Sequence, residues 1–140
     1  AKSKIDCFSL GTDDYLAKPF NENQLTQSAL RYQLFRQTYQ QNPAIQLGGV
    51  TVAWLNAALS AIKELNHTTL SLPVLLLQAG QDEIVENSAQ DSWLVHNKNA
   101  EYKLFATAKH ELLCEQDTIR TAVITSIYTF FDLLTTDSGS

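Results

Sequence analysis

The chain has 140 residues, enough for one domain of ordinary size; 44% of them are hydrophobic and 18% are charged. That balance is typical of a globular protein and excludes an intrinsically disordered one. Lys and Arg total 10 against 15 Asp and Glu, which gives a net charge of −5. Because phosphate contacts need a basic surface, we expect no nucleic-acid partner.

The cysteine pattern and the hydropathy pattern bear on location. Cys7 and Cys114 lie far apart in the sequence and neither has a CxxC partner, which is typical of a reducing compartment. No run of about 18 apolar residues is present, as a transmembrane helix would need. We therefore expect a cytoplasmic protein. The sequence begins at Ala1 and contains no Met, and we expect that its beginning is missing.

Residues 1–70 carry helical patterns and no strand pattern. Apolar or aromatic residues recur at helical spacing over residues 25–39, and Asn42-Pro43 ends the pattern. A second predicted helix opens at Gly48-Gly49 and has Trp54 on its apolar face. We expect residues 1–70 to form a helical segment inserted before the sheet.

The second half of the chain carries an alternating pattern of strands and helices. The apolar run 74–77 predicts a strand that is buried on both faces, as in parallel sheets. A helix is predicted over 88–96, a second strand over 102–106 and a last helix from Asp117. This order is a right-handed crossover unit, so the strands should be parallel and close. The predicted fold class is α/β, with residues 71–140 as a βαβα part.

A two-stranded parallel sheet leaves its edges open. Two short strands do not bury both faces or protect their edges unaided. We therefore expect a partner for the open edge, either the missing N-terminal part of the same fold or another copy of the chain in an oligomer.

Two titratable residues follow the predicted strands. Asp82 comes after the first strand and His110 after the second. In open parallel sheets, ligands and catalytic groups gather at the carboxyl ends of the strands, and neighbouring strands are about 4.8 Å apart. A carboxylate bonded to one ring nitrogen fixes the imidazole tautomer, so that the other nitrogen can act as a base. Asp before His is also the chain order of the α/β-hydrolases, in which the serine comes first.

Simpler interpretations remain open at this point. His110 could cap the last helix at the surface, Asp82 could serve only to form a turn, and Cys114 could act as a nucleophile with His110. Other acidic residues close enough in the sequence to take the place of the acid are Glu83, Glu86, Glu111 and Glu115. The histidines are scattered, and the chain has no HExxH motif or cysteine cluster, so we predict no metal site and no cofactor.

Three parts of the chain resemble one family. The acid motif of the monoglyceride-lipase-like (serine aminopeptidase-like) branch of the α/β-hydrolases is similar to residues 75–85, LLLQAGQDEIV. Its histidine motif is similar to residues 108–115, AKHELLCE. The cap of bacterial lysophospholipases resembles residues 19–32 and 42–49, together with Trp54. The likeness covers nearly the whole chain.

The resemblance implies an eight-stranded α/β-hydrolase fold of which this chain carries part. Residues 1–70 would be the helical cap, and residues 71–140 the last two strands with their helices. Asp82 would be the orienting acid and His110 the general base, with a serine in a Gly-x-Ser-x-Gly elbow as the nucleophile. None of the 5 glycines lies in such a motif. We therefore expect the serine and the oxyanion-hole loop upstream, and no activity in this chain alone.

The same resemblance implies hydrolysis of a carboxylic ester in a lysophospholipid or monoacylglycerol. Arg31 and Arg36 could meet a phosphate head group, and Tyr32, Phe35 and Trp54 could bind the substrate from the cap. Solvated charge and ordinary helix packing are the simpler explanations. A lipid substrate implies peripheral contact with the inner membrane. The alternatives are a non-catalytic fragment or binding module, or a hydrolase of peptides or thioesters.

Overall fold

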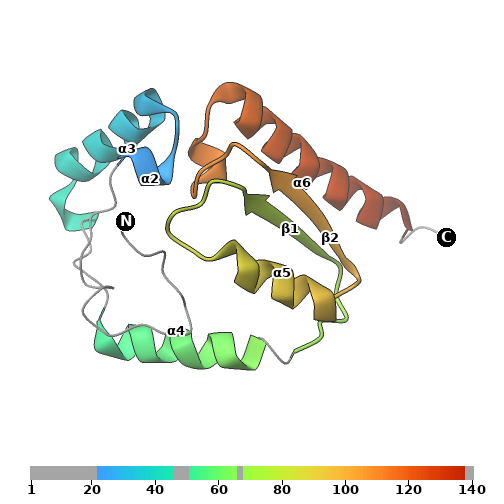
Figure 1. Cartoon of the computed structure of the whole chain (residues 1–140). Helices are drawn as coiled ribbons and strands as arrows, with labels where there is room; N and C mark the ends of the chain where they lie inside the picture. The colour runs from blue at the N-terminus through green and yellow to red at the C-terminus, as the bar shows by residue number, and fades with distance from the viewer. Residues whose placement is uncertain (1–21, 46–50, 66–67, 138–140) are drawn as a thin grey trace.

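The structure, a computed structural model, describes residues 22–45, 51–65 and 68–137 (Figure 1). In chain order the elements are α2 (Glu22–Leu25), α3 (Ala29–Gln41), the 3-10 helix η1 (Pro43–Ile45), α4 (Val52–Leu65), β1 (Val74–Ala79), α5 (Asn87–His96), β2 (Ala100–Phe105), the 3-10 helix η2 (Leu112–Cys114) and α6 (Asp117–Asp137). The described part of α4 begins at Val52, while Gly48 and Gly49, where its start was predicted, lie outside the described residues.

The two strands pair in parallel, as predicted. Val74 lies opposite Ala100, and the register runs without interruption to Ala79 opposite Phe105. β1 therefore extends two residues beyond its apolar run, and β2 begins two residues earlier than its pattern indicated. Across the described ranges, these strands form one two-stranded sheet, and the side chains of residues 74–77 are half-buried.

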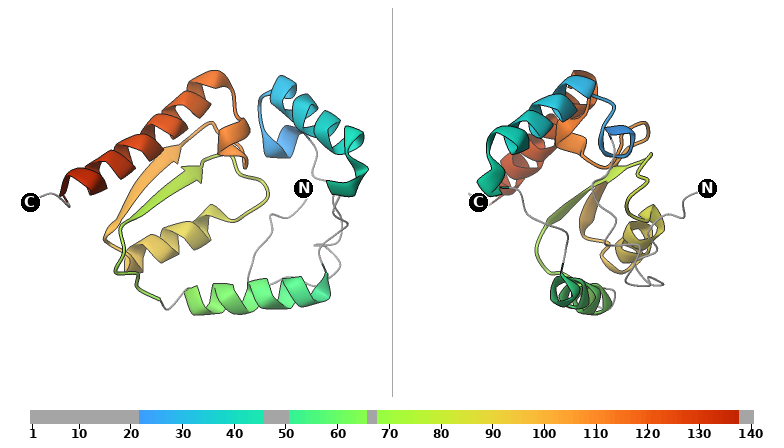
Figure 2. Two further views of the ribbon diagram at one scale, coloured as in Figure 1. Left: turned by 180° about the vertical axis from the view of Figure 1, so that it is seen from behind. Right: turned by 90° about the vertical axis from the view of Figure 1, so that its left-hand side faces the viewer.

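Helices lie on both faces of this sheet. α6 runs along one face and α5 along the other, as the views in Figure 1 and Figure 2 agree. The core between the sheet and α6 is built around buried apolar residues: Ala79, Phe105, Ala108 and Val123, with Leu77, Leu112, Ile119, Ala122 and Ile127 packed against them. Side chains alternate between the faces of a strand, so the neighbour of Leu77 and Ala79 must face α5.

That neighbour, Gln78, is buried, and polar partners hold it. Its Nε2 donates to the carbonyl of Asn87 at 3.3 Å and to Oδ1 of Asp91 at 3.1 Å, both in α5. Its Oε1 accepts a hydrogen bond from the Tyr102 hydroxyl of β2 at 2.7 Å. A buried amide without partners would be costly, so these bonds fix α5 against the sheet.

α4 lies below α5 in Figure 1, and only its C-terminal end comes near β1. Ile62 and Leu65 of α4 line an open apolar hollow together with residues 74–76 of β1 and Trp93 of α5. Along the described stretches, no helix has both the length and the apolar character needed to cross a bilayer.

The single helix predicted over residues 25–39 is wrong in one respect, because it is interrupted at Thr26. The Thr26 hydroxyl accepts the N–H of Ser28 at 2.9 Å, and α3 begins only at Ala29. Ser28 is its N-cap, with the side chain accepting from the N–H of Arg31 at 3.4 Å. Contacts of residues 25–27 with a distant part of the chain, described below, hold this segment out of the helix.

The turn after β1 lies directly against the backbone after β2. The N–H of Gly80 donates to the carbonyl of Phe105 at 2.9 Å. A Cβ atom added at Gly80 would lie 2.5 Å from the carbonyl oxygen and 2.6 Å from the Cα of Ala106. Both are backbone atoms that cannot turn away, so only glycine fits at this position.

We therefore expect Gly80→Ala to destabilise the chain by about 1–3 kcal/mol, the usual cost of inserting an atom into a packed site. Urea unfolding followed by circular dichroism measures the change. The control is Gln81→Ala, because the Gln81 side chain is exposed and its backbone contact is unaffected. An equal stability in Gly80→Ala and Gln81→Ala would contradict the close approach.

Candidate active site

The loop that follows β1 carries Asp82 and is ordered by this residue. Oδ1 of Asp82 accepts the N–H of Ile84 at 2.8 Å and the N–H of Val85 at 3.0 Å. Only 4% of Asp82 is exposed, so its carboxylate is held within the fold. Asp82 therefore forms the turn, which was the simpler interpretation of its position, but this uses one carboxylate oxygen only.

The loop that follows β2 carries His110. The chain turns at once after the strand, where the N–H of Ala108 donates to the carbonyl of Phe105 at 3.0 Å. Ala108 is fully buried, and its own carbonyl accepts the N–H of Gln81 at 2.8 Å. A backbone hydrogen bond thus joins the two loops close to the residues that they carry.

The imidazole of His110 meets the second oxygen of Asp82. Nδ1 of His110 and Oδ2 of Asp82 are 2.9 Å apart, and 29% of the imidazole side chain is exposed against 4% of the carboxylate. This contact was predicted from the positions of the two residues after neighbouring parallel strands. The carboxylate of the pair is therefore buried, and the imidazole is partly exposed.

The pKa of Asp82 lies below its ordinary value. Burial raises this pKa, but the hydrogen bond from His110 and those from the backbone N–H groups of Val85 and Ile84 lower it by more. The carboxylate is therefore ionised at neutral pH and can only accept hydrogen bonds. It follows that Nδ1 of a neutral His110 carries the proton and Nε2 carries the lone pair, which is the arrangement of a general base.

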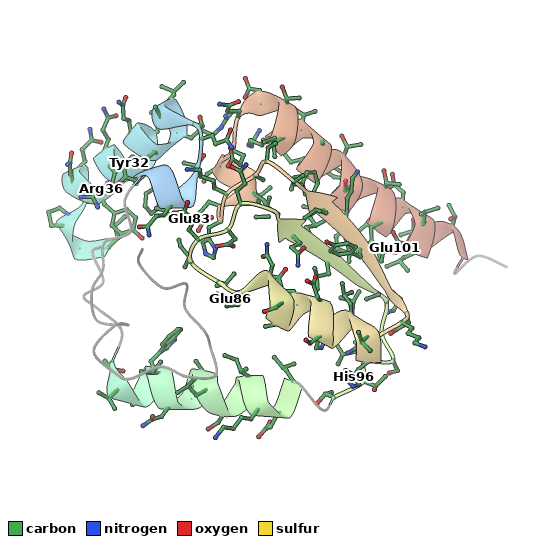
Figure 3. All side chains as sticks on the ribbon, viewed as in Figure 1. Tyr32, Arg36, Glu83, Glu86, His96 and Glu101 are labelled. Atoms are coloured by element: carbon green, nitrogen blue, oxygen red, sulfur yellow. The ribbon has the colours of Figure 1, made fainter. Side chains whose placement is uncertain are left out.

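The other acidic residues take different positions. Glu83 is exposed, and Glu83 and Glu86 lie in the loop between β1 and α5 (Figure 3). Glu115 is fully buried, and its carboxylate accepts backbone N–H groups. Burial, together with the nearby charge of Glu111, raises the pKa of the Cys114 thiol above its ordinary value. The raised pKa disfavours the thiolate, which a cysteine nucleophile needs.

The four predicted substrate-binding residues are divided between α3 and α4. Arg31 forms an ion pair with Asp117 and donates from Nη1 to the carbonyl of Glu115 at 2.8 Å, so it anchors α3 to the start of α6. Figure 3 shows Tyr32 on α3, where it is half-buried. Phe35 is 46% exposed, and its ring centroid lies 4.8 Å from that of Tyr39 in the same helix. Trp54 of α4 is 51% exposed. Their role in binding stays a prediction.

One group of contacts has no counterpart in the sequence analysis. Residues 25–27 bind the loop that carries His110: the carbonyl of Leu25 accepts the N–H of Glu111 at 2.8 Å, and the Thr26 hydroxyl donates to the carbonyl of Cys114 at 2.7 Å. The partners are more than 80 residues apart, and no local pattern marks such a pairing.

In the described part of the chain, no three His, Cys, Asp or Glu residues gather as a metal site would require.

Comparison with known proteins decides the family. The sequence matches the family described as serine aminopeptidase, S33, over residues 9–117. The chain belongs to this family. Its membership confirms the resemblance that the motifs around Asp82 and His110 predicted, and the chain carries part of an α/β-hydrolase fold.

Two curated relatives of this S33 family member are named as lysophospholipases. The probable lysophospholipase L2 of Haemophilus influenzae is 32% identical over 90% of this chain and 41% of its own length. Lysophospholipase L2 of Escherichia coli K12 is 29% identical over 96% of this chain and 42% of its own length. The chain thus spans about two fifths of the length of the curated relatives that it matches.

A crystal structure supports the same fold for this family member. The soluble variant of monoglyceride lipase from Saccharomyces cerevisiae, in complex with a substrate analog, superimposes with a TM-score of 0.61 over 82% of this chain and 42% of the lipase. The two sequences are 15% identical, so the likeness concerns the fold alone.

The lowered pKa of Asp82 predicts how stability depends on pH. The folded state holds the ionised carboxylate better than the unfolded state does, so this contribution is present above the ordinary pKa of an aspartate and is lost as the pH falls through the lowered one. We expect Asp82→Asn to cost about 1.5–3 kcal/mol at pH 5, as for hydrogen bonds to a charged group, and progressively less as the pH falls and the carboxylate of the wild type is protonated. Urea unfolding from pH 5 downward measures the difference in unfolding free energy between the wild type and Asp82→Asn. A difference that stays the same as the pH falls would contradict the lowered pKa of Asp82.

Proposed function

We propose that this chain supplies the acid and the base of a Ser-His-Asp triad in a carboxylic-ester hydrolase that acts on lysophospholipids or monoacylglycerols. The observation that carries the proposal is the 2.9 Å bond between Asp82 and His110 at the carboxyl ends of two parallel strands. The names of the lysophospholipase relatives and of the monoglyceride lipase support the substrate class.

In this proposal the two residues have distinct roles. Nε2 of His110 takes the proton of the serine hydroxyl as the oxygen attacks the ester carbonyl, and the resulting imidazolium gives that proton to the leaving alcohol. His110 then takes a proton from water as the water oxygen attacks the acyl-enzyme, and it returns this proton to the serine oxygen when the carboxylic acid leaves. Asp82 keeps the imidazole in the Nδ1–H tautomer and stabilises its positive charge, without itself becoming protonated.

The proposal places the nucleophile outside these 140 residues. None of the glycines in the sequence is part of a Gly-x-Ser-x-Gly motif, the elbow that exposes the serine in α/β-hydrolases. The 140-residue chain alone should therefore hydrolyse no ester, and activity belongs to the full polypeptide in which this sequence occurs.

The helical part would serve as the cap over the site. Residues 1–70 would form this cap and residues 71–140 the last part of the core, with Arg31, Tyr32, Phe35 and Trp54 in contact with the substrate. Because Arg31 already pairs with Asp117, a phosphate head group would have to share or displace this partner. A lipid substrate would bring the protein into peripheral contact with the inner membrane from the cytoplasm.

A second candidate substrate class is a peptide or aminoacyl amide. The description of the matched family, serine aminopeptidase, favours this alternative. Amides and esters share the acyl-enzyme route, so the roles of Asp82 and His110 would be unchanged. Turnover of lysophospholipids, monoacylglycerols, thioesters and aminoacyl amides by the same preparation separates the classes.

We expect Asp82→Asn and His110→Ala to lower kcat in the full polypeptide by at least about a hundredfold. The Asn amide would donate to Nδ1 of His110 and force the proton onto Nε2; the corresponding change in a serine protease costs about 10⁴-fold. Kinetics with a monoacylglycerol and a lysophospholipid measure the effect.

The control is Glu83→Gln, which removes an exposed carboxylate one residue from Asp82 and should leave kcat within about twofold, as expected for a surface position. Near-native turnover in Asp82→Asn or His110→Ala would refute the assignment of the triad. A wild-type polypeptide that turns over no substrate in the panel would favour a non-catalytic binding module instead.

A further inference from the structure

A second buried carboxylate lies beside the candidate active site. Glu115 is fully buried, at 0% exposed, and it stands just before α6. A buried charge is costly unless hydrogen bonds compensate it, so its presence needs a physical explanation. The proposed roles of Asp82 and His110 leave Glu115 unused.

Backbone N–H groups from two distant segments surround this carboxylate. Oε1 accepts the N–H of Lys109, the residue before His110, at 2.8 Å. Oε2 accepts the N–H of Gln27, between α2 and α3, at 3.2 Å, and the N–H of Gln116 at 3.2 Å. Three N–H donors compensate the burial of this carboxylate, and they join the segment before α3 to the loop that carries His110.

The peptide group between Ala108 and Lys109 is hydrogen-bonded at both its carbonyl and its N–H. The carbonyl of Ala108 and the N–H of Lys109 belong to the same planar unit, and they point in opposite directions. The carbonyl accepts the N–H of Gln81 at 2.8 Å, from the loop that carries Asp82, and the N–H donates to Glu115 at 2.8 Å. The Ala108–Lys109 peptide, directly before His110, is therefore held between the loop that carries Asp82 and the side chain of Glu115.

From this geometry we infer that Glu115 is a positioning residue for His110, which it acts on through the backbone and not through the imidazole. The inference rests on the proposed function insofar as it concerns turnover. Glu115 fixes the Ala108–Lys109 peptide, and the fixed peptide presents His110 to Asp82 in one orientation. The same carboxylate joins the segment before α3 to this loop through Gln27.

The chemistry of the site calls for a carboxylate and not an amide. A glutamine has one acceptor oxygen and an NH₂ group, so either the N–H of Lys109 or the N–H groups of Gln27 and Gln116 would face a second donor. Glu115→Gln keeps the shape of the side chain but disrupts the hydrogen bonds on one side of it. It is thus the most direct variant.

Thr26→Val is the matched control. Thr26 is 3% exposed, and its hydroxyl ties the same segment to the same loop through the carbonyl of Cys114 at 2.7 Å. This hydroxyl bonds to Cys114 and Ser28, whereas the peptide before His110 is bonded to Glu115 and Gln81, so the loss of the hydroxyl should loosen the segment without turning that peptide. The two variants therefore separate positioning from general stability.

The test reads the tautomer of His110 from the ¹⁵N shifts of its ring nitrogens, together with kcat and KM, all in the full polypeptide. In Glu115→Gln we expect loss of the single Nδ1–H tautomer, with kcat lowered about 10- to 100-fold and KM within about twofold, as for a small misplacement of a reacting group. Thr26→Val should keep the wild-type tautomer and a kcat within about threefold of wild type, as expected when no reacting group is misplaced.

Two results would overturn the inference: an unchanged tautomer and kcat in Glu115→Gln, or the same changes in Thr26→Val as in Glu115→Gln. If Glu115→Gln does not fold, Glu115→Asp takes its place. This variant keeps the charge but is too short to reach both sides, so a wild-type tautomer in it would equally overturn the inference. If the wild-type polypeptide has no turnover, the proposed function fails, while the ring-nitrogen shifts still decide the role of Glu115.

Discussion

The hydrogen bond between His110 and Asp82 is the interaction on which the rest of the account depends. It joins the loops that follow two adjacent parallel strands, and it gives each partner a defined chemical state. The bond helps to keep Asp82 ionised inside the fold, and the ionised carboxylate in turn keeps the proton on Nδ1 of His110. Without this bond, the acid would be a turn residue and the histidine a half-exposed side chain.

Several parts of the fold bring these two side chains together. The parallel register of β1 and β2 ends both strands at the same edge of the sheet. Gly80 lets the first loop pass against the backbone of Ala106, where any side chain would collide. The buried residues Phe105 and Val123 belong to the core that packs α6 against the sheet. The site is therefore a consequence of strand order, one glycine and one packed helix.

Much of this arrangement could be predicted from the sequence because its signals are local. The apolar run before Gln78 marked the first strand, and Asp82 and His110 followed the strands closely enough for their meeting to be expected. The interruption of the first helix at Thr26 was missed, because its cause lies in residues 111–115, more than 80 positions away. Glu115 was considered only as an alternative acid for His110, and its burial among backbone N–H groups was not predicted, because burial and long-range backbone bonds leave no periodic pattern in a single sequence.

A double-mutant cycle in the full polypeptide tests the central interaction most directly. The unfolding free energies of the wild type, Asp82→Ala, His110→Ala and the double variant, measured by urea unfolding at pH 7, give the coupling between the two side chains. The account predicts a favourable coupling of about 1 kcal/mol or more, as residues in one hydrogen-bonded network show. Additive effects, within about 0.3–0.5 kcal/mol, would contradict it.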